Sequence, residues 1–251
     1  MLNQTTLTRL RELRLRGMAD ALVAQQQQPE MQGLTFEERL GLLVDLEWTY
    51  RQNRKLARLL KAAKLRVPAC IEDIDYEHPR GLDRMLMRTL ATCQWVEQQQ
   101  QILITGPTGV GKTYVACALA NAACRHGYTA RYYRLPRLLQ ELATAKADGS
   151  YPHLMNTLLK TEVLILDDWG LAPISAAEAR DLLEVIDDRV QKRSTIVSSQ
   201  LPLEHWHTGI GDPTVADAIL DRLLHGAHKI ALKGESMRKV LKAPLQNTPT
   251  D

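Results

Sequence analysis

Short apolar segments alternate with longer amphipathic ones over most of the chain. Five short segments predict strands, at 102–104, 129–134, 163–166, 194–198 and 229–232. Between and after them, apolar residues at helical spacing predict helices at 135–147, 151–160, 175–190, 213–224 and 234–241. Only helical spacing occurs before residue 100. The pattern therefore divides the chain into an all-helical first part and a second part of alternating strands and helices.

The first part contains three predicted helices. A leucine stripe indicates one helix over 1–30, a capping box at 35–38 begins a second helix that runs to about 48, and Val67-Pro68 ends a third. We expect a small helical domain over 1–68, a connector with one further helix over 69–100, a larger domain over 101–243 and a loose tail over 244–251.

The third helix, over 51–66, holds seven basic residues and no acidic one. On a helical wheel five of them gather within one third of the circumference: Arg51, Arg54, Lys55, Arg58 and Lys61. A solvated face usually carries acidic residues among its basic ones, whereas a face without them favours binding to a polyanion. DNA is the first candidate, and an anionic membrane surface is the weaker alternative.

A glycine-rich segment follows the first predicted strand and precedes a helix. It fits the phosphate-binding pattern G-x-x-x-x-G-K-[ST] over its full length: Gly106, Pro107, Thr108, Gly109, Val110, Gly111, Lys112 and Thr113. The glycines let backbone N–H groups point at phosphate oxygens, and the helix N-terminus adds partial positive charge. Lys112 is expected to reach the β and γ phosphates and Thr113 to hold Mg²⁺. A chance glycine turn lacks this context, so we predict a nucleoside triphosphate site.

The strand at 163–166 ends in Asp167-Asp168. The carboxyl end of a buried parallel strand opens on the ligand crevice of an α/β sheet. Four apolar residues followed by an acidic one are therefore what a Mg²⁺-positioning carboxylate requires.

Composition narrows the choice of partners and compartment. The whole chain has 32 basic and 29 acidic residues, so the positive charge that binds a nucleic acid has to be concentrated in one region. Residues 1–68 have such an excess, with 12 basic and 7 acidic side chains. No apolar run is long enough to span a membrane, and the N-terminus has no signal-peptide core. The four cysteines lack C-x-x-C spacing, so we expect buried thiols and a cytoplasmic protein.

Over nearly its whole length the chain resembles the AAA+ P-loop ATPases, and most closely the IstB helper ATPases of insertion sequences, relatives of the DnaC helicase loaders and the DnaA initiator. The resemblance rests on the segments Arg54–Lys61, Arg80–Asp83, Gly106–Thr113, Leu164–Gly170, Ser198-Ser199-Gln200-Leu201-Pro202, Ala216–Leu223 and Gly234-Glu235-Ser236-Met237-Arg238. It implies an α/β fold with a central parallel sheet, preceded by a small all-α domain.

The resemblance also assigns roles to the candidate site residues. Asp167 would hold Mg²⁺ through water, and Asp168 would polarise the attacking water, where AAA+ proteins commonly have the longer glutamate. Ser199 and Gln200 would sense the γ-phosphate. Arg222 matches the arginine finger that acts on a neighbouring subunit, and Arg238 matches a second sensor within its own subunit. On their own, these arginines would be interpreted as surface ion pairs.

The two helices over 135–160 resemble the initiator-type insertion, where Arg134, Arg137 and Lys146 would face DNA. The family implies an ATP-dependent homo-oligomer on double-stranded DNA that stimulates the transposase of the same insertion sequence. One alternative is a helicase loader, which would prefer single-stranded DNA. A second alternative is a small-molecule kinase, which would need an acceptor pocket and would turn over without DNA.

Overall fold

The computed structural model describes residues 4–237. The chain forms two compact units, Met1–Arg58 and Leu59–Asp251. The first domain boundary predicted from the sequence is at residue 68. That boundary stays a prediction.

The first unit is entirely helical over its described residues. Its elements are α1 (Gln4–Glu12), α2 (Arg16–Gln27), the 3-10 helix η1 (Pro29–Gly33) and the greater part of α3 (Phe36–Ala63). The single helix predicted over 1–30 is therefore divided. The chain turns at Arg14, whose φ is +60°, and α2 then passes so close to α3 that a Cβ on Gly17 would lie 2.8 Å from Cβ of Tyr50. Glycine at this position permits the close approach.

The helix α3 is longer than the sequence analysis predicts. The capping box at its start is present, because the Thr35 amide donates to the Glu38 carboxylate at 2.8 Å and the Glu38 amide to the Thr35 hydroxyl at 3.3 Å. The helix then continues through Ala63 without the break expected after Trp48. Six large apolar side chains in its first half are exposed: Phe36, Leu40, Leu42, Val44, Leu46 and Trp48.

A five-stranded parallel sheet forms the centre of the second unit, in the order β2-β3-β4-β1-β5. The strands are β1 (Ile102–Thr105), β2 (Ala130–Arg134), β3 (Val163–Trp169), β4 (Ser194–Ser199) and β5 (His228–Ala231). The helical elements are α4 (Arg84–Ala91), α5 (Gln94–Glu97), α6 (Lys112–Arg125), α7 (Leu135–Asp148), α8 (Tyr151–Lys160), α9 (Ala176–Arg189), η2 (Leu203–His205), η3 (His207–Gly209) and α10 (Pro213–Leu224).

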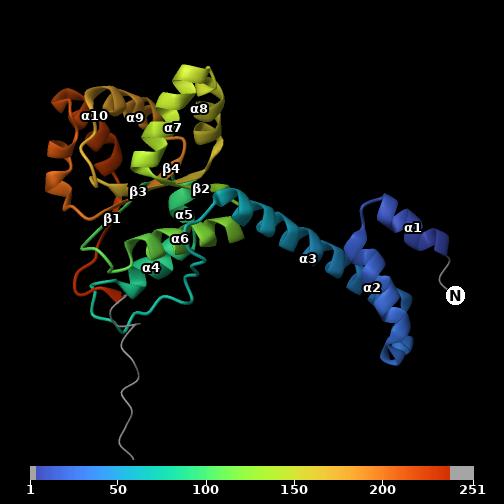
Figure 1. Cartoon of the computed structure of the whole chain (residues 1–251). Helices are drawn as coiled ribbons and strands as arrows, with labels where there is room; N and C mark the ends of the chain where they lie inside the picture. The colour runs from blue at the N-terminus through green and yellow to red at the C-terminus, as the bar shows by residue number, and fades with distance from the viewer. Residues whose placement is uncertain (1–3, 238–251) are drawn as a thin grey trace, which may run out of the picture. The chain divides into compact units, whose positions relative to one another are not determined.

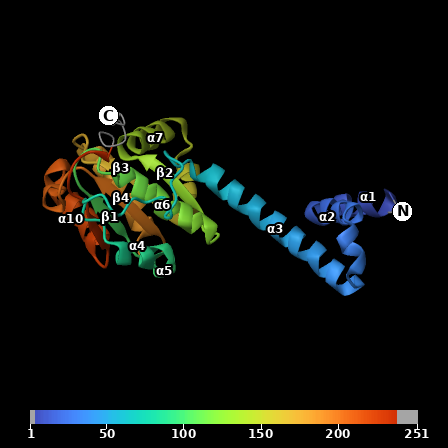
Figure 2. The ribbon, with the colours of Figure 1, turned by 90° about the horizontal axis from the view of Figure 1, so that it is seen from below.

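Helices cover both faces of this sheet. Helix α6 packs along one face with α4 beside it, and α7, α9 and α10 cover the other (Figure 1 and Figure 2). Leucine, isoleucine and valine side chains of α7, α9, α10, β3 and β4 form the main core. Trp206 is buried there, and the centroid of its ring lies 5.0 Å from that of Trp169.

Local signals predicted the helix starts of this unit correctly. Ser175 and Glu178 form the reciprocal capping box of α9, and the Asp212 carboxylate caps α10 just before Pro213. The helix predicted over 234–241 lies mostly outside the described residues. Among residues 4–237, no helix combines the length and the apolar character that crossing a bilayer requires.

Candidate nucleotide-binding site

The glycine-rich turn joins β1 to α6, as its motif predicts. Gly109 and Gly111 have φ of +89° and +97°, a region that glycine enters without steric cost. A Cβ on Gly109 would lie 2.1 Å from Oγ of Ser236, and one on Gly111 would lie 2.5 Å from Nη1 of Arg80. Both the backbone conformation and the surrounding side chains therefore require glycine here.

Lys112 lies folded against this turn. Its ammonium donates to the carbonyl oxygens of Gly106 at 2.7 Å and Pro107 at 2.8 Å. Burial lowers the pKa of Lys112 from its ordinary value. Both acceptors are neutral, and hydrogen bonds to charged oxygens are stronger. An anionic oxygen in the turn would therefore draw the ammonium away from the two carbonyls.

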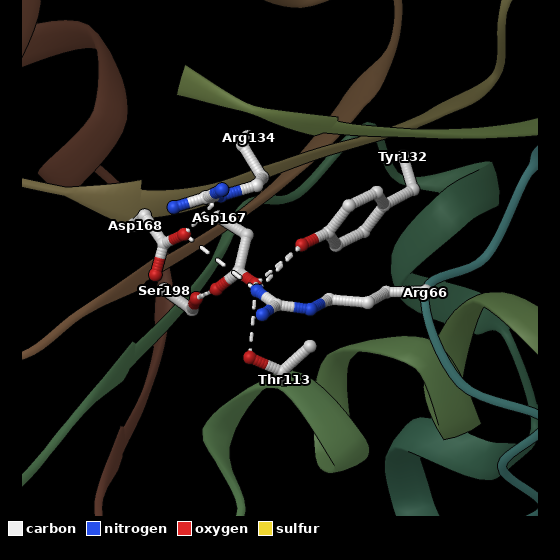
Figure 3. Close-up of polar contacts among 7 residues, drawn as sticks. All are labelled: Arg66, Thr113, Tyr132, Arg134, Asp167, Asp168 and Ser198. Carbon is white, nitrogen blue, oxygen red and sulfur yellow. Dashed lines mark hydrogen bonds and ion pairs between the residues drawn. The ribbon is translucent and has the colours of Figure 1, made fainter. Parts of the chain in front are cut away.

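Asp167 lies beneath the turn and is almost fully buried. Three hydroxyl groups from three different elements donate to its carboxylate: Thr113 at 2.9 Å, Tyr132 at 2.6 Å and Ser198 (Figure 3). Burial raises the pKa of Tyr132, so its phenol stays protonated and acts as a donor. Thr113 and Asp167 are both predicted to hold Mg²⁺, whereas neither Tyr132 nor Ser198 is predicted to belong to the site.

Asp168 adopts a left-handed backbone conformation, with φ of +62°. Among residues with a side chain, aspartate and asparagine enter this region most readily. The conformation gives a physical reason for aspartate where AAA+ proteins commonly have glutamate. The Asp168 carboxylate accepts a hydrogen bond from Nε of Arg134 at 2.6 Å. Arg134, which the family resemblance assigns to DNA, therefore lies at the carboxylate pair in this structure.

Arg66 also lies at the carboxylate pair. Its Nη1 is 3.7 Å from Oδ2 of Asp167, 3.6 Å from Oδ2 of Asp168, and 3.5 Å from the Tyr132 hydroxyl to which it donates (Figure 3). The hydrogen bond to Tyr132 raises the pKa of Arg66, so the guanidinium keeps its charge. In the sequence Arg66 belongs to the basic run, and no spacing connects it to the carboxylates.

The residues predicted to sense the γ-phosphate have different contacts. Gln200 accepts a hydrogen bond from the Thr108 hydroxyl at 2.7 Å, which joins the end of β4 to the phosphate loop. The Ser199 hydroxyl donates to the Trp169 carbonyl at 2.8 Å and accepts from the Leu201 amide at 3.0 Å. Ser199 therefore has a structural role in this state, and its sensing role stays a prediction.

Two adjoining cavities meet at Arg66, Gly109, Lys112 and Thr113. One, of about 270 Å³, is also lined by Thr108, Arg134, Asp167, Asp168, Leu171, Ser198, Ser199 and Gln200. The other, of about 450 Å³, is also lined by Val67, Asp73, Asp75, Arg80, Gly111, Tyr114 and Met237. The phosphate loop thus separates a carboxylate-lined cavity from one with more apolar walls.

Arg80 connects the second cavity to the phosphate loop. It is buried, and its guanidinium donates to the Val110 carbonyl at 3.0 Å and the Asp75 carbonyl at 2.9 Å. Burial lowers the pKa of Arg80. The segment Arg80–Asp83 carries part of the family resemblance, but nothing in the sequence placed Arg80 under the loop.

The two arginines assigned by resemblance lie away from these cavities or outside the described residues. Arg222 of α10 forms an ion pair with Asp187 of α9 and donates to the Ala218 carbonyl at 2.8 Å. It lines neither cavity, and its action on a neighbouring subunit's nucleotide stays a prediction. Arg238 lies outside the described residues.

The predicted basic face of α3 is exposed, with one member paired. Arg51 forms an ion pair with Glu47 at 2.6 Å, and the Arg54 guanidinium lies over the Tyr50 ring. The other members of the face, Lys55, Arg58 and Lys61, are exposed. Among residues 4–237, no carboxylate pairs with Arg54, Lys55, Arg58 or Lys61.

The candidates in the 135–160 insertion are paired with neighbouring acidic residues. Arg137 of α7 lies 3.5 Å from Glu141, one helical turn along, and remains well exposed. Lys146 forms an ion pair with Asp181 of α9. Among the described residues, α7 therefore has fewer basic side chains without an acidic partner than α3 has.

The chain is similar to known proteins over most of its length. Residues 8–244 match the model of the family described as IstB-like ATP binding protein. An insertion-sequence ATP-binding protein of Sinorhizobium fredii is 48% identical over 239 residues, covering 95% of this chain and 98% of that protein. A counterpart from Pseudomonas fluorescens is 53% identical over 214 residues, covering 85% and 93%. The fold is similar to that of DnaI, with a TM-score of 0.57, 20% identity, and coverage of 71% of this chain and 92% of that one.

The family match and the relatives confirm the resemblance to the IstB helper ATPases, and the likeness to DnaI supports the α/β fold. The chain belongs to the IstB-like ATP-binding protein family of insertion sequences.

Proposed function

We propose that this protein is an ATPase that assembles on double-stranded target DNA and stimulates the transposase of its insertion sequence. The observation that carries the proposal is the arrangement of Lys112, Thr113 and Asp167 around one phosphate-binding turn, with Asp168 beside them. Family membership supports ATP as the nucleotide.

The two cavities fit the two ends of a nucleoside triphosphate. The larger cavity offers Val67, Tyr114 and Met237 for a base, and the smaller one lies beside Lys112 and the carboxylates. In this arrangement the triphosphate crosses the turn, where backbone amides and the start of α6 favour negative charge. Lys112 then exchanges its two carbonyl partners for phosphate oxygens.

The donor set beneath the turn fits Mg²⁺. Thr113 and Asp167 present hard oxygen donors that already lie 2.9 Å apart, and Mg²⁺ prefers oxygen ligands. When bound, Mg²⁺ neutralises charge on the phosphate oxygens during transfer. Tyr132 and Ser198 keep the Asp167 carboxylate oriented, and Asp168 can accept a proton from water once it is free of Arg134.

Assembly is the second part of the proposal. Arg222 is partly exposed in the single chain, so a neighbouring subunit can reach it if the pair with Asp187 opens. Its guanidinium would then neutralise charge on that neighbour's nucleotide. The apolar side chains exposed along the first half of α3 provide additional surface for contacts between subunits.

The basic face of α3 supports DNA as the platform of this assembly, because it presents cations with no carboxylate partner among the described residues. The insertion-sequence relatives support a transposase as the protein partner. A helicase loader is the second candidate, favoured by the likeness of the fold to the DnaC helicase loader. It would bind single-stranded DNA and a replicative helicase.

Calorimetric titration of ATP into the Lys112→Ala variant tests the nucleotide site. We expect affinity to fall at least about tenfold, because a buried ammonium no longer meets the phosphates. Lys160→Ala, at the exposed end of α8, is the matched control and should bind as the parent does. Equal affinity in Lys112→Ala and the parent would remove the assignment.

The DNA part is tested separately by fluorescence anisotropy with ATP, using labelled duplex and single-stranded DNA of the same sequence. Tighter binding to duplex, together with stimulation of the transposase of the same insertion sequence, supports the transposition role. Preference for the single strand would favour the helicase-loader alternative.

A further inference from the structure

The guanidinium of Arg66 occupies a position that the mechanism above leaves unexplained. It approaches the carboxylates of both Asp167 and Asp168, within 4 Å of each (Figure 3). Arg134 approaches the same oxygen of Asp168, Oδ2, with its Nε at 2.6 Å. Two carboxylates and two guanidinium groups thus form a cluster without net charge, in a pocket where Asp167 is 1% exposed.

Arg66 approaches the Asp167 carboxylate, which is predicted to hold the metal ion. Oδ2 of Asp167 accepts the Thr113 hydroxyl at 2.9 Å, and Nη1 of Arg66 lies 3.7 Å from that oxygen. A divalent cation held between Thr113 and Asp167 would therefore lie a few ångströms from the guanidinium. Charges of the same sign at that separation repel each other, and the burial of Asp167 reduces the screening by water.

We propose that Arg66 is the internal counter-charge of the carboxylate pair and that Mg²⁺ displaces it. The inference rests on the proposed function, because it concerns the same metal site. Arg66 lines both cavities, so phosphate oxygens crossing the loop offer the displaced guanidinium new acceptors. The residue therefore exchanges a carboxylate partner for a phosphate partner when Mg²⁺ and ATP bind together.

The position of Arg66 in the chain gives this exchange a consequence. Helix α3 ends at Ala63, and Lys64 turns the chain in a left-handed conformation with φ of +51°. Arg66 follows two residues later, so a shift of its guanidinium acts on the segment that directly follows the basic helix. Any contact that holds this segment away from the carboxylates therefore favours Mg²⁺ binding. By thermodynamic linkage, Mg²⁺ binding in turn favours the displaced position of the segment.

The test uses Mn²⁺ as a spectroscopic substitute for Mg²⁺, titrated into the full chain without nucleotide and followed by electron paramagnetic resonance. Arg66→Gln should bind Mn²⁺ about tenfold more tightly than the parent, because a nearby charge commonly shifts an ionic equilibrium by one logarithmic unit or more. Titrated with ATP in EDTA, the same variant should bind ATP more weakly than the parent. Opposite changes in the two affinities are the signature of exchange between carboxylate and phosphate.

Two control variants separate charge from structure. Arg66→Lys keeps the positive charge and should keep the weak Mn²⁺ binding of the parent. Arg125→Gln removes an ion-paired arginine of similar exposure, bound to Glu72 at 2.6 Å, and should change neither affinity. Thermal melting checks that each variant is folded.

Three outcomes would overturn the proposal: unchanged or weaker Mn²⁺ binding in Arg66→Gln, equal gains in Arg66→Gln and Arg66→Lys, or unchanged ATP binding in EDTA. Asp167→Asn distinguishes this failure from that of the proposed function. If Asp167→Asn abolishes Mn²⁺ binding while Arg66→Gln behaves as the parent, only the role of Arg66 is wrong. If Asp167→Asn binds Mn²⁺ as the parent does, the metal site itself is wrong.

Discussion

The basic face of α3 makes a quantitative prediction about DNA binding. Arg54, Lys55 and Arg58 are exposed, whereas Arg51 is already neutralised by Glu47 and is left unchanged. Each phosphate contact contributes about 0.9 to the slope of log affinity against log salt, so a triple alanine variant should lose about 2.7. Between 50 and 200 mM salt, the affinity ratio of parent to variant should therefore shrink about 40-fold.

The assay is fluorescence anisotropy of a labelled duplex at four salt concentrations, repeated with an unrelated sequence. The weakening should be similar for both duplexes, because phosphates carry no sequence information. A matched triple variant, Lys160→Ala with Arg180→Ala and Lys192→Ala, removes the same charge from exposed positions of the other unit and should keep the parent slope. An unchanged slope in the α3 variant, with ATP binding intact, would refute the reasoning and leave α7 as the remaining predicted DNA surface.

Three further predictions concern catalysis and stability. Asp168→Asn keeps a residue type suited to the left-handed φ of +62°, so it should bind ATP normally and stop hydrolysis. A parent-like rate of phosphate release would remove Asp168 as the base. Mixing Arg222→Ala with Lys112→Ala should restore part of the ATPase activity, since each variant supplies what the other lacks; no recovery in mixed assemblies would contradict action between subunits. Arg189→Met should lower the free energy of unfolding by about 2–4 kcal/mol, because the buried guanidinium donates to the carbonyls of residues 158, 161 and 194. Urea denaturation measures this against exposed Arg180→Met, and equal stability of the two variants would contradict the estimate.

Most of the second unit could be predicted because its signals are local. The strand at 163–166 and the helix at 213–224 are specified by runs of apolar residues and by capping groups within a few positions. The first unit was harder, since the break at Arg14 and the continuity of α3 depend on contacts between helices. The close approach of Gly17 to Tyr50 joins residues 33 positions apart, and periodicity cannot reveal such a pairing.

The same distinction applies to the site. The phosphate loop and the carboxylate pair are contiguous motifs, so the sequence locates them. Tyr132 and Ser198 reach Asp167 from the two neighbouring strands. The sequence indicates this proximity only indirectly, because both residues lie towards the carboxyl ends of predicted parallel strands, which meet at one edge of the sheet. Arg66 and Arg80 lie in the segment that connects α3 to α4. Their contacts with the loop depend on the path that the chain takes there, and the composition of the segment does not reveal that path.

The walls of the phosphate loop come from opposite ends of the second unit. Arg80 stands against Gly111, while Ser236 stands against Gly109 and the Met237 amide donates to the Gly109 carbonyl at 3.0 Å. During synthesis on the ribosome, residues 232–237 emerge after the entire sheet. A nascent chain that has made every strand therefore still lacks one wall of its nucleotide cradle. We therefore expect nucleotide to be retained only once these last residues are in place, which would keep unfinished chains out of the proposed ATP-dependent assembly.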